Sequence, residues 1–315
     1  MIVPCAVKRR WFAPFFAVAV ALGAAPGRSQ PAPAGPTVAV TREFDGLSEA
    51  RILEAIRSAP VVGRQNVGST SVNFHLHLRG GIDAAFKPRT TTQGENYRAE
   101  IAAFRLNRLL GLSRVPPAIS RSISRATLRL APDSPVIFER DRSARGAAIY
   151  WVPVLRPSRI DSAEDQVLWG RWLRQGHAVP ADQAQRAEEI STLLVFDFLT
   201  GNWDRWSGAN VPMDAHGHLV YRDNNHGFEE PFVDGLLQRS RSLLQRTQCF
   251  SRAVIRQARA LTEASVRAEM ALDPDRTSPP LNPAQIRSLL RRRDLLLEYV
   301  DGLARRYGEA AVFAW

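Results

Sequence analysis

The spacing of apolar residues changes along this chain, and the change limits the folds that the chain can adopt. Up to about residue 155, short segments alternate between apolar and polar side chains, as at Val72, Phe74 and Leu76, with the period of a β-strand. From Asp161 onward the apolar residues recur with helical spacing. The sequence therefore predicts an α+β fold with a small sheet-rich N-lobe at 42–155 and a larger helical C-lobe at 156–315. Clefts between lobes commonly bind ligands.

The elements of each lobe follow from the same patterns. Candidate strands cover 71–78, 82–88, 136–139 and 147–155, and candidate helices cover 48–58, about 95–110, 162–174, 182–199, 235–246, 250–272 and 283–307. The turn Gly80–Gly81 joins the first two strands into a β-hairpin. Thr92 and Glu95 have capping-box spacing before a helix that is apolar around much of its circumference. A β-like insertion is expected at 210–227.

The first 30 residues have the features of a secretory signal peptide and contain no acidic side chain. A basic segment, Lys8–Arg10, precedes a short apolar stretch from Trp11 to Ala25. This predicts a secreted or periplasmic protein, with a single uncleaved membrane anchor as the alternative. Residues 31–41 form a Pro/Ala linker. No later apolar stretch is long enough to span a bilayer, so no stable membrane insertion is expected after cleavage.

Lysine is nearly absent, which draws attention to the position that keeps it. Of 42 basic side chains, the lysines are Lys8 in the predicted signal peptide and Lys87 at the end of a candidate strand. A compact ammonium performs a task that a planar guanidinium cannot imitate, such as contacting a nucleotide phosphate; chance retention is the alternative. Glu100 follows on the apolar helix, where a carboxylate needs a partner such as Lys87, unless it occupies an exposed face.

Polar residues gather most densely in two segments of the predicted C-lobe. Asp204 follows a helix that ends at Gly201, Asn210 comes six residues later, and Asp223 follows the short apolar segment 219–221. In phosphoryl transfer, one aspartate accepts the proton of the attacking hydroxyl, while another aspartate and an asparagine hold a divalent metal through oxygen ligands. Each segment taken alone is also compatible with ordinary Asx-turns.

Four segments together resemble the four-jointed family of secretory-pathway kinases, an atypical branch of the protein-kinase-like fold. The segments are AAFKP (84–88), YRAEIAAFRLNRLLG (97–111), FDFLTGNWDR (196–205) and DNNHGF (223–228), and the resemblance covers most of residues 60–230. It implies a site for ATP with Mg²⁺ or Mn²⁺. In that site, Lys87 would contact the phosphates, and Glu100 would pair with Lys87 or the metal. Asp204 would be the catalytic aspartate, and Asp223 would bind metal with Asn210, which is a less certain match.

The chain also departs from this family. The family's eukaryotic members are rich in disulfides, whereas cleavage of the signal peptide would leave Cys249 as the only cysteine, predicted to be a buried small apolar residue. This indicates a bacterial relative. The loop that would cover the phosphates is poorly defined, because neither Gly63 with Gly68 nor Gly80 with Gly81 makes a convincing signature.

These observations predict a secreted or periplasmic kinase that transfers the γ-phosphate of ATP to a hydroxyl, with protein Ser/Thr as the first choice of acceptor and a sugar as the second. A pseudokinase that binds nucleotide or a partner is the alternative. A third hypothesis is an envelope protein that binds anions through the arginine-rich surface implied by a formal charge of +11. The scattered arginines do not indicate a nucleic-acid partner.

His75 and His77 share one strand face and could form half of a metal site. No third ligand is evident, so we interpret them as ordinary strand positions.

Overall fold

The structure is a computed structural model, and it describes residues 42–315 except 69–70, 95, 132, 207–209 and 231–233. The predicted signal peptide, the predicted linker and Glu95 lie outside the described residues. Within the described part of the chain, no helix combines the length and the apolar composition needed to cross a membrane.

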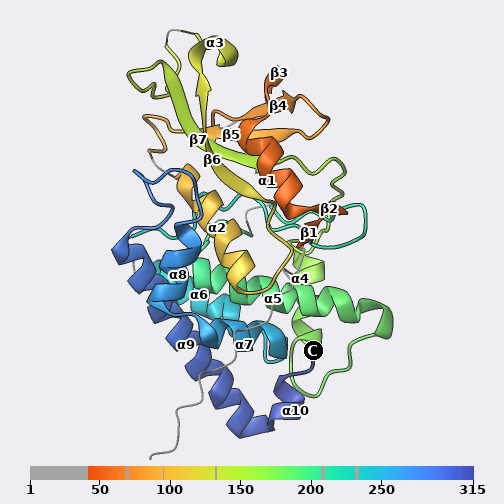
Figure 1. Ribbon diagram of the computed structural model, residues 1–315. Helices are drawn as coiled ribbons and strands as arrows, with labels where there is room; N and C mark the ends of the chain where they lie inside the picture. The colour runs from red at the N-terminus through yellow and green to blue at the C-terminus, as the bar shows by residue number, and fades with distance from the viewer. Residues whose placement is uncertain (1–41, 69–70, 95, 132, 207–209, 231–233) are drawn as a thin grey trace, which may run out of the picture. The chain divides into compact units, whose positions relative to one another are not determined.

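Strands dominate the first part of the described chain and helices the rest (Figure 1). The strands are β1 (Glu43–Phe44), β2 (Leu47–Ser48), β3 (Val61–Asn66), β4 (Phe74–Leu78), β5 (Ala84–Pro88), β6 (Ala118–Ser124) and β7 (Ser143–Tyr150). The helices are α1 (Glu49–Ser58), α2 (Tyr97–Leu109), α3 (Arg125–Leu128), α4 (Ala163–Trp172), η1 (Ala181–Gln183, a 3₁₀ turn), α5 (Ala184–Thr200), α6 (Asp234–Leu244), α7 (Arg252–Ala260), α8 (Glu263–Met270), α9 (Pro283–Tyr307) and α10 (Glu309–Val312).

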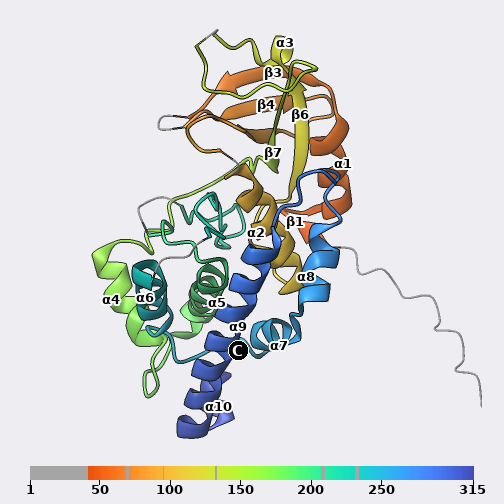
Figure 2. The same cartoon turned by 90° about the vertical axis from the view of Figure 1, so that its left-hand side faces the viewer.

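The main sheet is antiparallel with the strand order β3-β4-β5-β7-β6. The predicted hairpin is confirmed, because β4 and β5 pair with His75 opposite Ala85. One face of the sheet forms an apolar core with α1, to which Ile52, Ile56 and Phe86 contribute. Figure 2 shows α1 beside this sheet and α2 between the sheet and the helices of the C-terminal part.

Alternation in β5 decides where the lone lysine of the described chain points. Ala84, Phe86 and Pro88 are buried, while Ala85 and Lys87 lie on the opposite face of the strand. Successive strand side chains point to opposite faces, so the burial of Phe86 in the α1 core turns Lys87 away from that core. Lys87 therefore faces the α2 side of the sheet.

The predicted second strand pair is wrong. β7 begins at Ser143 and pairs with β5 and β6, whereas Val136 and Phe138 form isolated bridges and no strand. The turn ends earlier than predicted because the Asp141 carboxylate accepts hydrogen bonds from the backbone and hydroxyl of Ser143.

Two strands of the main sheet, β3 and β6, were not predicted from the sequence, and neither were the short strands β1 and β2. Both β3 and β6 lie at edges of the sheet, where polar side chains are common, and both lack the regular apolar alternation of a buried strand. In β6, for example, Arg121 follows three buried residues and donates hydrogen bonds to the carbonyls of Ile56 and Ala59 in and after α1.

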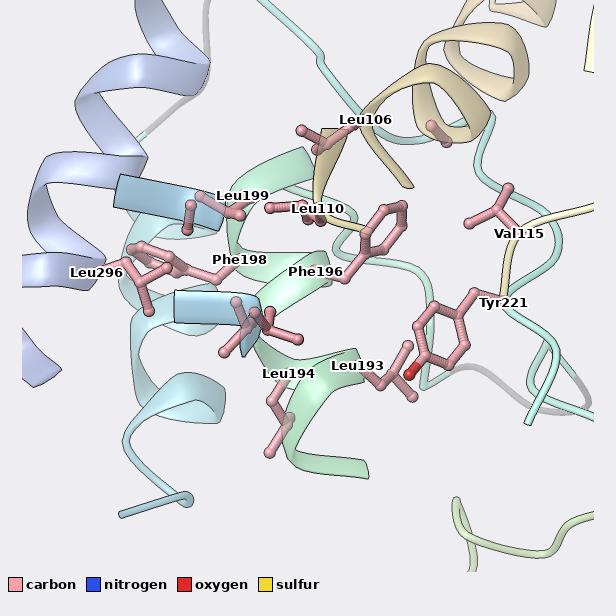
Figure 3. Packing of buried hydrophobic residues seen from close by; sticks show 14 of the residues in the cluster. Leu106, Leu110, Val115, Leu193, Leu194, Phe196, Phe198, Leu199, Tyr221 and Leu296 are labelled. Atoms are coloured by element: carbon pink, nitrogen blue, oxygen red, sulfur yellow. The ribbon is translucent and has the colours of Figure 1, made fainter. Parts of the chain in front are cut away.

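The helices of the C-terminal part surround α5, which is buried from Glu189 to Thr200. In Figure 3, Phe198 points toward Leu296 of α9, while Phe196 points toward Tyr221, at a ring-centroid distance of 5.7 Å. A helix apolar on all sides is a core helix, and its C-terminus is correspondingly well anchored.

Two predictions for this part of the chain need correction. The predicted helix 250–272 is divided into α7 and α8, because Thr262 forms a capping box with Ser265 and starts a new helix. The predicted β-like insertion at 210–227 contains a bridge between Met213 and Leu219 but no strand among its described residues.

We expect Gly146→Ala to destabilise the protein. A Cβ at Gly146 would lie 2.3 Å from the carbonyl oxygen of Lys87, so β5 and β7 would have to separate, at a cost of about 1–3 kcal/mol. Gly235→Ala in α6 is the matched control, because a Cβ there meets nothing within 4 Å. Urea unfolding of both variants measures the difference, and equal stabilities would contradict the close approach of the two strands.

Candidate active site

Lys87 lies between two carboxylates that are far apart in the sequence. Its Nζ atom is 2.6 Å from Oε1 of Glu100 on α2 and 2.7 Å from Oδ1 of Asp223. The Glu100 side chain is 3% exposed, so the alternative of an exposed helix position is wrong. The contacts join the sheet, α2 and the segment that follows Tyr221.

The charges in this cluster stabilise one another. Burial acts to lower the pKa of Lys87, but the neighbouring Glu100 and Asp223 carboxylates outweigh it and raise that pKa. Burial acts to raise the pKa of Asp223, and Lys87 outweighs it, so that the pKa lies below its usual value. Lys87 and Asp223 are therefore both charged at neutral pH.

Asn224 holds Glu100 in place and was not identified from the sequence. Its backbone N–H donates to Oε1 of Glu100 at 3.0 Å, and its side-chain amide donates to Oε2 at 3.3 Å. Its Oδ1 atom accepts a hydrogen bond of 2.6 Å from Arg205. The one signal in the sequence was its position directly after Asp223.

Arg205 is fully buried and connects the polar segments of the site. Its Nε atom lies 3.0 and 3.2 Å from the two oxygens of Asp197 on α5, and its other nitrogens donate to Asn224 and to the carbonyls of Asn210 and Arg222. Burial raises the pKa of Asp197 to about 6 and Arg205 opposes this rise, so Asp197 is ionised at neutral pH.

Asp204 lies on the loop that leaves α5. Gly201 ends the helix in the left-handed conformation, at φ 71°, which glycine adopts without strain. The backbone N–H of Asp204 donates to Oδ1 of Asn202 at 3.2 Å, and the Asn202 amide donates to the Asp223 carbonyl at 3.4 Å. The Asn210 amide donates to the Asp204 carbonyl at 3.3 Å.

Among the predicted site residues, the structure thus brings Lys87, Glu100 and Asp223 into direct contact. Asp204 and Asn210 lie on the adjoining loop and are linked to Asp223 through Asn202.

Asp223 has a strained backbone, with φ at 58° in the left-handed region. Asp and Asn tolerate this conformation better than most side chains, but it carries an energetic cost. Such strain is often found where a side chain must point in a particular direction for function. The Asp223 side chain is 41% exposed, in contrast to the buried Glu100, so it remains accessible from the cleft.

A cleft of about 240 Å³ opens beside the charged cluster. Its lining combines apolar side chains with the cluster at one end: Val67, Asn73, Ala85, Lys87, Glu100, Val115, Pro116, Ile149, Tyr150, Trp151, Val152, Leu155, Val220, Arg222 and Asp223. Val67 and Asn73 lie at the two ends of the β3–β4 connection, which contains Gly68. A Cβ on Gly68 would lie 1.6 Å from the Ser71 carbonyl oxygen, so this turn requires glycine.

The chain is similar in sequence to several known proteins. No protein-family model matches the chain. The chain is 26% identical to a glycosaminoglycan xylosylkinase of Danio rerio, over 80% of this chain and 74% of that protein. It is 24% identical to the Homo sapiens protein of the same name, over 58% and 57%, and 24% identical to pseudokinase FAM20A of Mus musculus, over 70% and 49%. The chain therefore spans little more than half of the human relative and about half of the mouse relative.

Two solved structures share the fold. Hydra Fam20 with sugar matches with a TM-score of 0.63 and 21% identity, over 84% of this chain and 91% of that chain. The Golgi casein kinase with Mn/ADP bound matches with a TM-score of 0.63 and 16% identity, over 84% and 78%. The chain therefore has a two-lobed, atypical kinase-like α+β fold, as predicted.

The resemblance to secretory-pathway kinases is confirmed: the chain is related to the Fam20 proteins in both sequence and fold. Its bacterial origin stays a prediction.

We expect Arg205→Met to destabilise the protein by about 3–5 kcal/mol, because it leaves the Asp197 carboxylate buried without its partner. Arg259→Met is the matched control. Arg259 also donates to both oxygens of an aspartate, Asp301, but this pair is exposed and such pairs contribute about 0–1 kcal/mol. Chemical denaturation of the two variants compares them, and a similar small loss in both would refute the connecting role of Arg205.

The contribution of Asp223 to stability depends on pH. Because its folded pKa lies below the ordinary 3.8, the stabilisation is fully present above pH 3.8 and is lost as pH falls through the folded pKa. The difference in unfolding free energy between the wild type and Asp223→Asn should therefore shrink on acidification below about pH 4. In a Lys87→Met background the same substitution should show little of this dependence, since Lys87 is the main cause of the lowered pKa.

Proposed function

We propose that this protein is a metal-dependent kinase that transfers the γ-phosphate of ATP to a hydroxyl group. The observation that carries the proposal is the position of Lys87, held by Glu100 and Asp223 at the charged end of an otherwise largely apolar cleft. An apolar slot suits a nucleotide base, and a fixed ammonium suits its phosphates.

Lys87 would orient the phosphates, while Glu100 and Asn224 would keep the ammonium in place. The two hydrogen bonds from Asn224 and the contact with Lys87 commit both oxygens of Glu100. Glu100 is therefore better suited to steadying Lys87 than to binding a ligand directly.

The residues present fit a divalent metal. Asp223 offers a partly exposed carboxylate, and Asn210 lies on the adjoining loop, which together are the hard oxygen donors that Mg²⁺ and Mn²⁺ prefer. The Golgi casein kinase, which shares the fold, is described with Mn/ADP bound. A bound ion would neutralise charge on the phosphates.

Asp204 would orient the acceptor hydroxyl and accept its proton. Its loop is fixed at one end by the buried helix α5 and at the other by Arg205, which suits a group that must be positioned within a fraction of an ångström. Positioning and charge neutralisation supply most of the rate in phosphoryl transfer.

Two hydroxyl acceptors fit this proposal. The relatives of Danio rerio and Homo sapiens are named glycosaminoglycan xylosylkinases, which supports a sugar hydroxyl. The Golgi casein kinase supports a protein Ser/Thr, the acceptor favoured by the sequence. A Drosophila melanogaster relative is named an extracellular serine/threonine protein, which supports secretion.

Asp204→Ala is expected to abolish phosphate transfer and to preserve nucleotide binding. Labelled ATP with Mn²⁺ or Mg²⁺, offered with a xylose-containing glycan or with casein, measures transfer, and calorimetry measures binding. Asp182→Ala, at an exposed position on η1, is the matched control and should transfer at the wild-type rate. Transfer that survives Asp204→Ala would refute the role of Asp204. Wild-type protein that binds ATP without transfer to any acceptor would instead indicate a pseudokinase, as the mouse relative is named.

A further inference from the structure

Two histidines and an aspartate converge on the hairpin β4–β5. Oδ2 of Asp83 lies 2.9 Å from Nε2 of His75 and 2.9 Å from Nδ1 of His77. The register explains the convergence: in this antiparallel pair His75 is opposite Ala85 and Leu76 is opposite Ala84, so the same register continued by one residue places His77 opposite Asp83. All three side chains therefore share the face of the hairpin that also carries Ala85 and Lys87.

The spacing of the three atoms is close to that of metal ligands. Each can offer one ligand atom, and these atoms all lie within 4.8 Å of one another. Two ligands of a tetrahedral zinc ion, each bonded at about 2.0–2.1 Å, are about 3.3 Å apart. The two separations between histidine nitrogens and the Asp83 oxygen, each 2.9 Å, need to widen by a few tenths of an ångström. The two histidine nitrogens lie within 4.8 Å of each other, so side-chain rotation has to bring all three atoms to about 3.3 Å from one another.

The site is also open enough to admit an ion with water. The side chains of His75, His77 and Asp83 are 14%, 38% and 28% exposed. Three protein ligands with an open fourth position are the arrangement of many zinc sites that keep a bound water. Two imidazoles and a carboxylate favour Zn²⁺ and other first-row transition metals over Mg²⁺, which prefers oxygen ligands.

The cluster adjoins the cleft through Trp151. The His75 and Trp151 rings are stacked at a centroid distance of 3.8 Å and an interplanar angle of 10°, and Trp151 lines the cleft. Fixing the His75 ring would therefore fix part of the cleft wall. The donor set differs from the oxygen donors near Asp223, so the two sites would select different ions.

We propose that His75, His77 and Asp83 form a transition-metal site that binds Zn²⁺ and ties β4 to the start of β5 beside the cleft. This proposal does not rest on the kinase proposal, and its failure would leave the kinase proposal standing.

Zn²⁺ binding to the tag-free chain, in the presence of millimolar Mg²⁺ to occupy oxygen-donor sites, tests the proposal. Calorimetry should show one Zn²⁺ per chain, and Co²⁺ should give the visible absorption of a tetrahedral complex. Because His77 is the most exposed of the three, His77→Ala is the variant best suited to keep the fold, and it should weaken Zn²⁺ binding by more than about tenfold. Asp83→Asn should have a similar effect.

His216→Ala is the matched control, at a turn position outside the cluster, and should bind Zn²⁺ like the wild type. Thermal unfolding without metal checks that each variant folds. In the wild type, Zn²⁺ should raise the unfolding temperature, and in His77→Ala this rise should be lost. Wild-type protein that fails to bind Zn²⁺, or a folded His77→Ala that binds it with unchanged affinity, would overturn the proposal.

Discussion

A guanidinium with no exposed surface organises the helical side of the cleft. Arg205 cannot lose its charge, so burying it requires acceptors for its N–H groups, and these come from α5, the loop after α5 and the segment that carries Asp223 and Asn224. Two of these acceptors are the backbone carbonyls of Asn210 and Arg222, which a shorter or differently shaped side chain would leave without this donor. The hydrogen bonds that compensate the charge hold the two loops together, and Asn202 links the backbone of Asp204 to the backbone of Asp223.

Lys87 joins the sheet to the helical part through ion pairs, much as Arg205 joins the loops of the helical part. Its contacts with Glu100 and Asp223 connect β5, α2 and the C-terminal loops through one ammonium. The two carboxylates differ in what they can still do. Glu100 is buried and fully hydrogen-bonded, while Asp223 is partly exposed toward the cleft. Asn224 links this cluster to Arg205, so the two cations Lys87 and Arg205 are parts of a single polar network.

Local patterns were sufficient for elements whose burial repeats regularly along the chain. The hairpin β4–β5 and the helix α9 follow from strict alternation and from a long helical period, and α9 has the predicted limits. The edge strands β3 and β6 lack a regular apolar period, because strands at the edge of a sheet commonly carry polar side chains. The predicted helix is interrupted at Thr262 because the side chains of Thr262 and Ser265 each accept a hydrogen bond from the other residue's backbone N–H. The apolar spacing of α7 and α8 does not reveal this capping box.

The sequence by itself determined the fold class and singled out Lys87, Glu100, Asp204 and Asp223, because charged residues next to apolar strands and helices need partners and their order resembled a known family. Only the tertiary structure decided what those partners are. The roles of Asn224 and Arg205 and the approach of Asp83 to His75 and His77 depend on strand register, backbone carbonyls and loops that lie far apart along the chain. Such contacts leave no periodic mark in the sequence, since each is made once and between segments that only folding brings together.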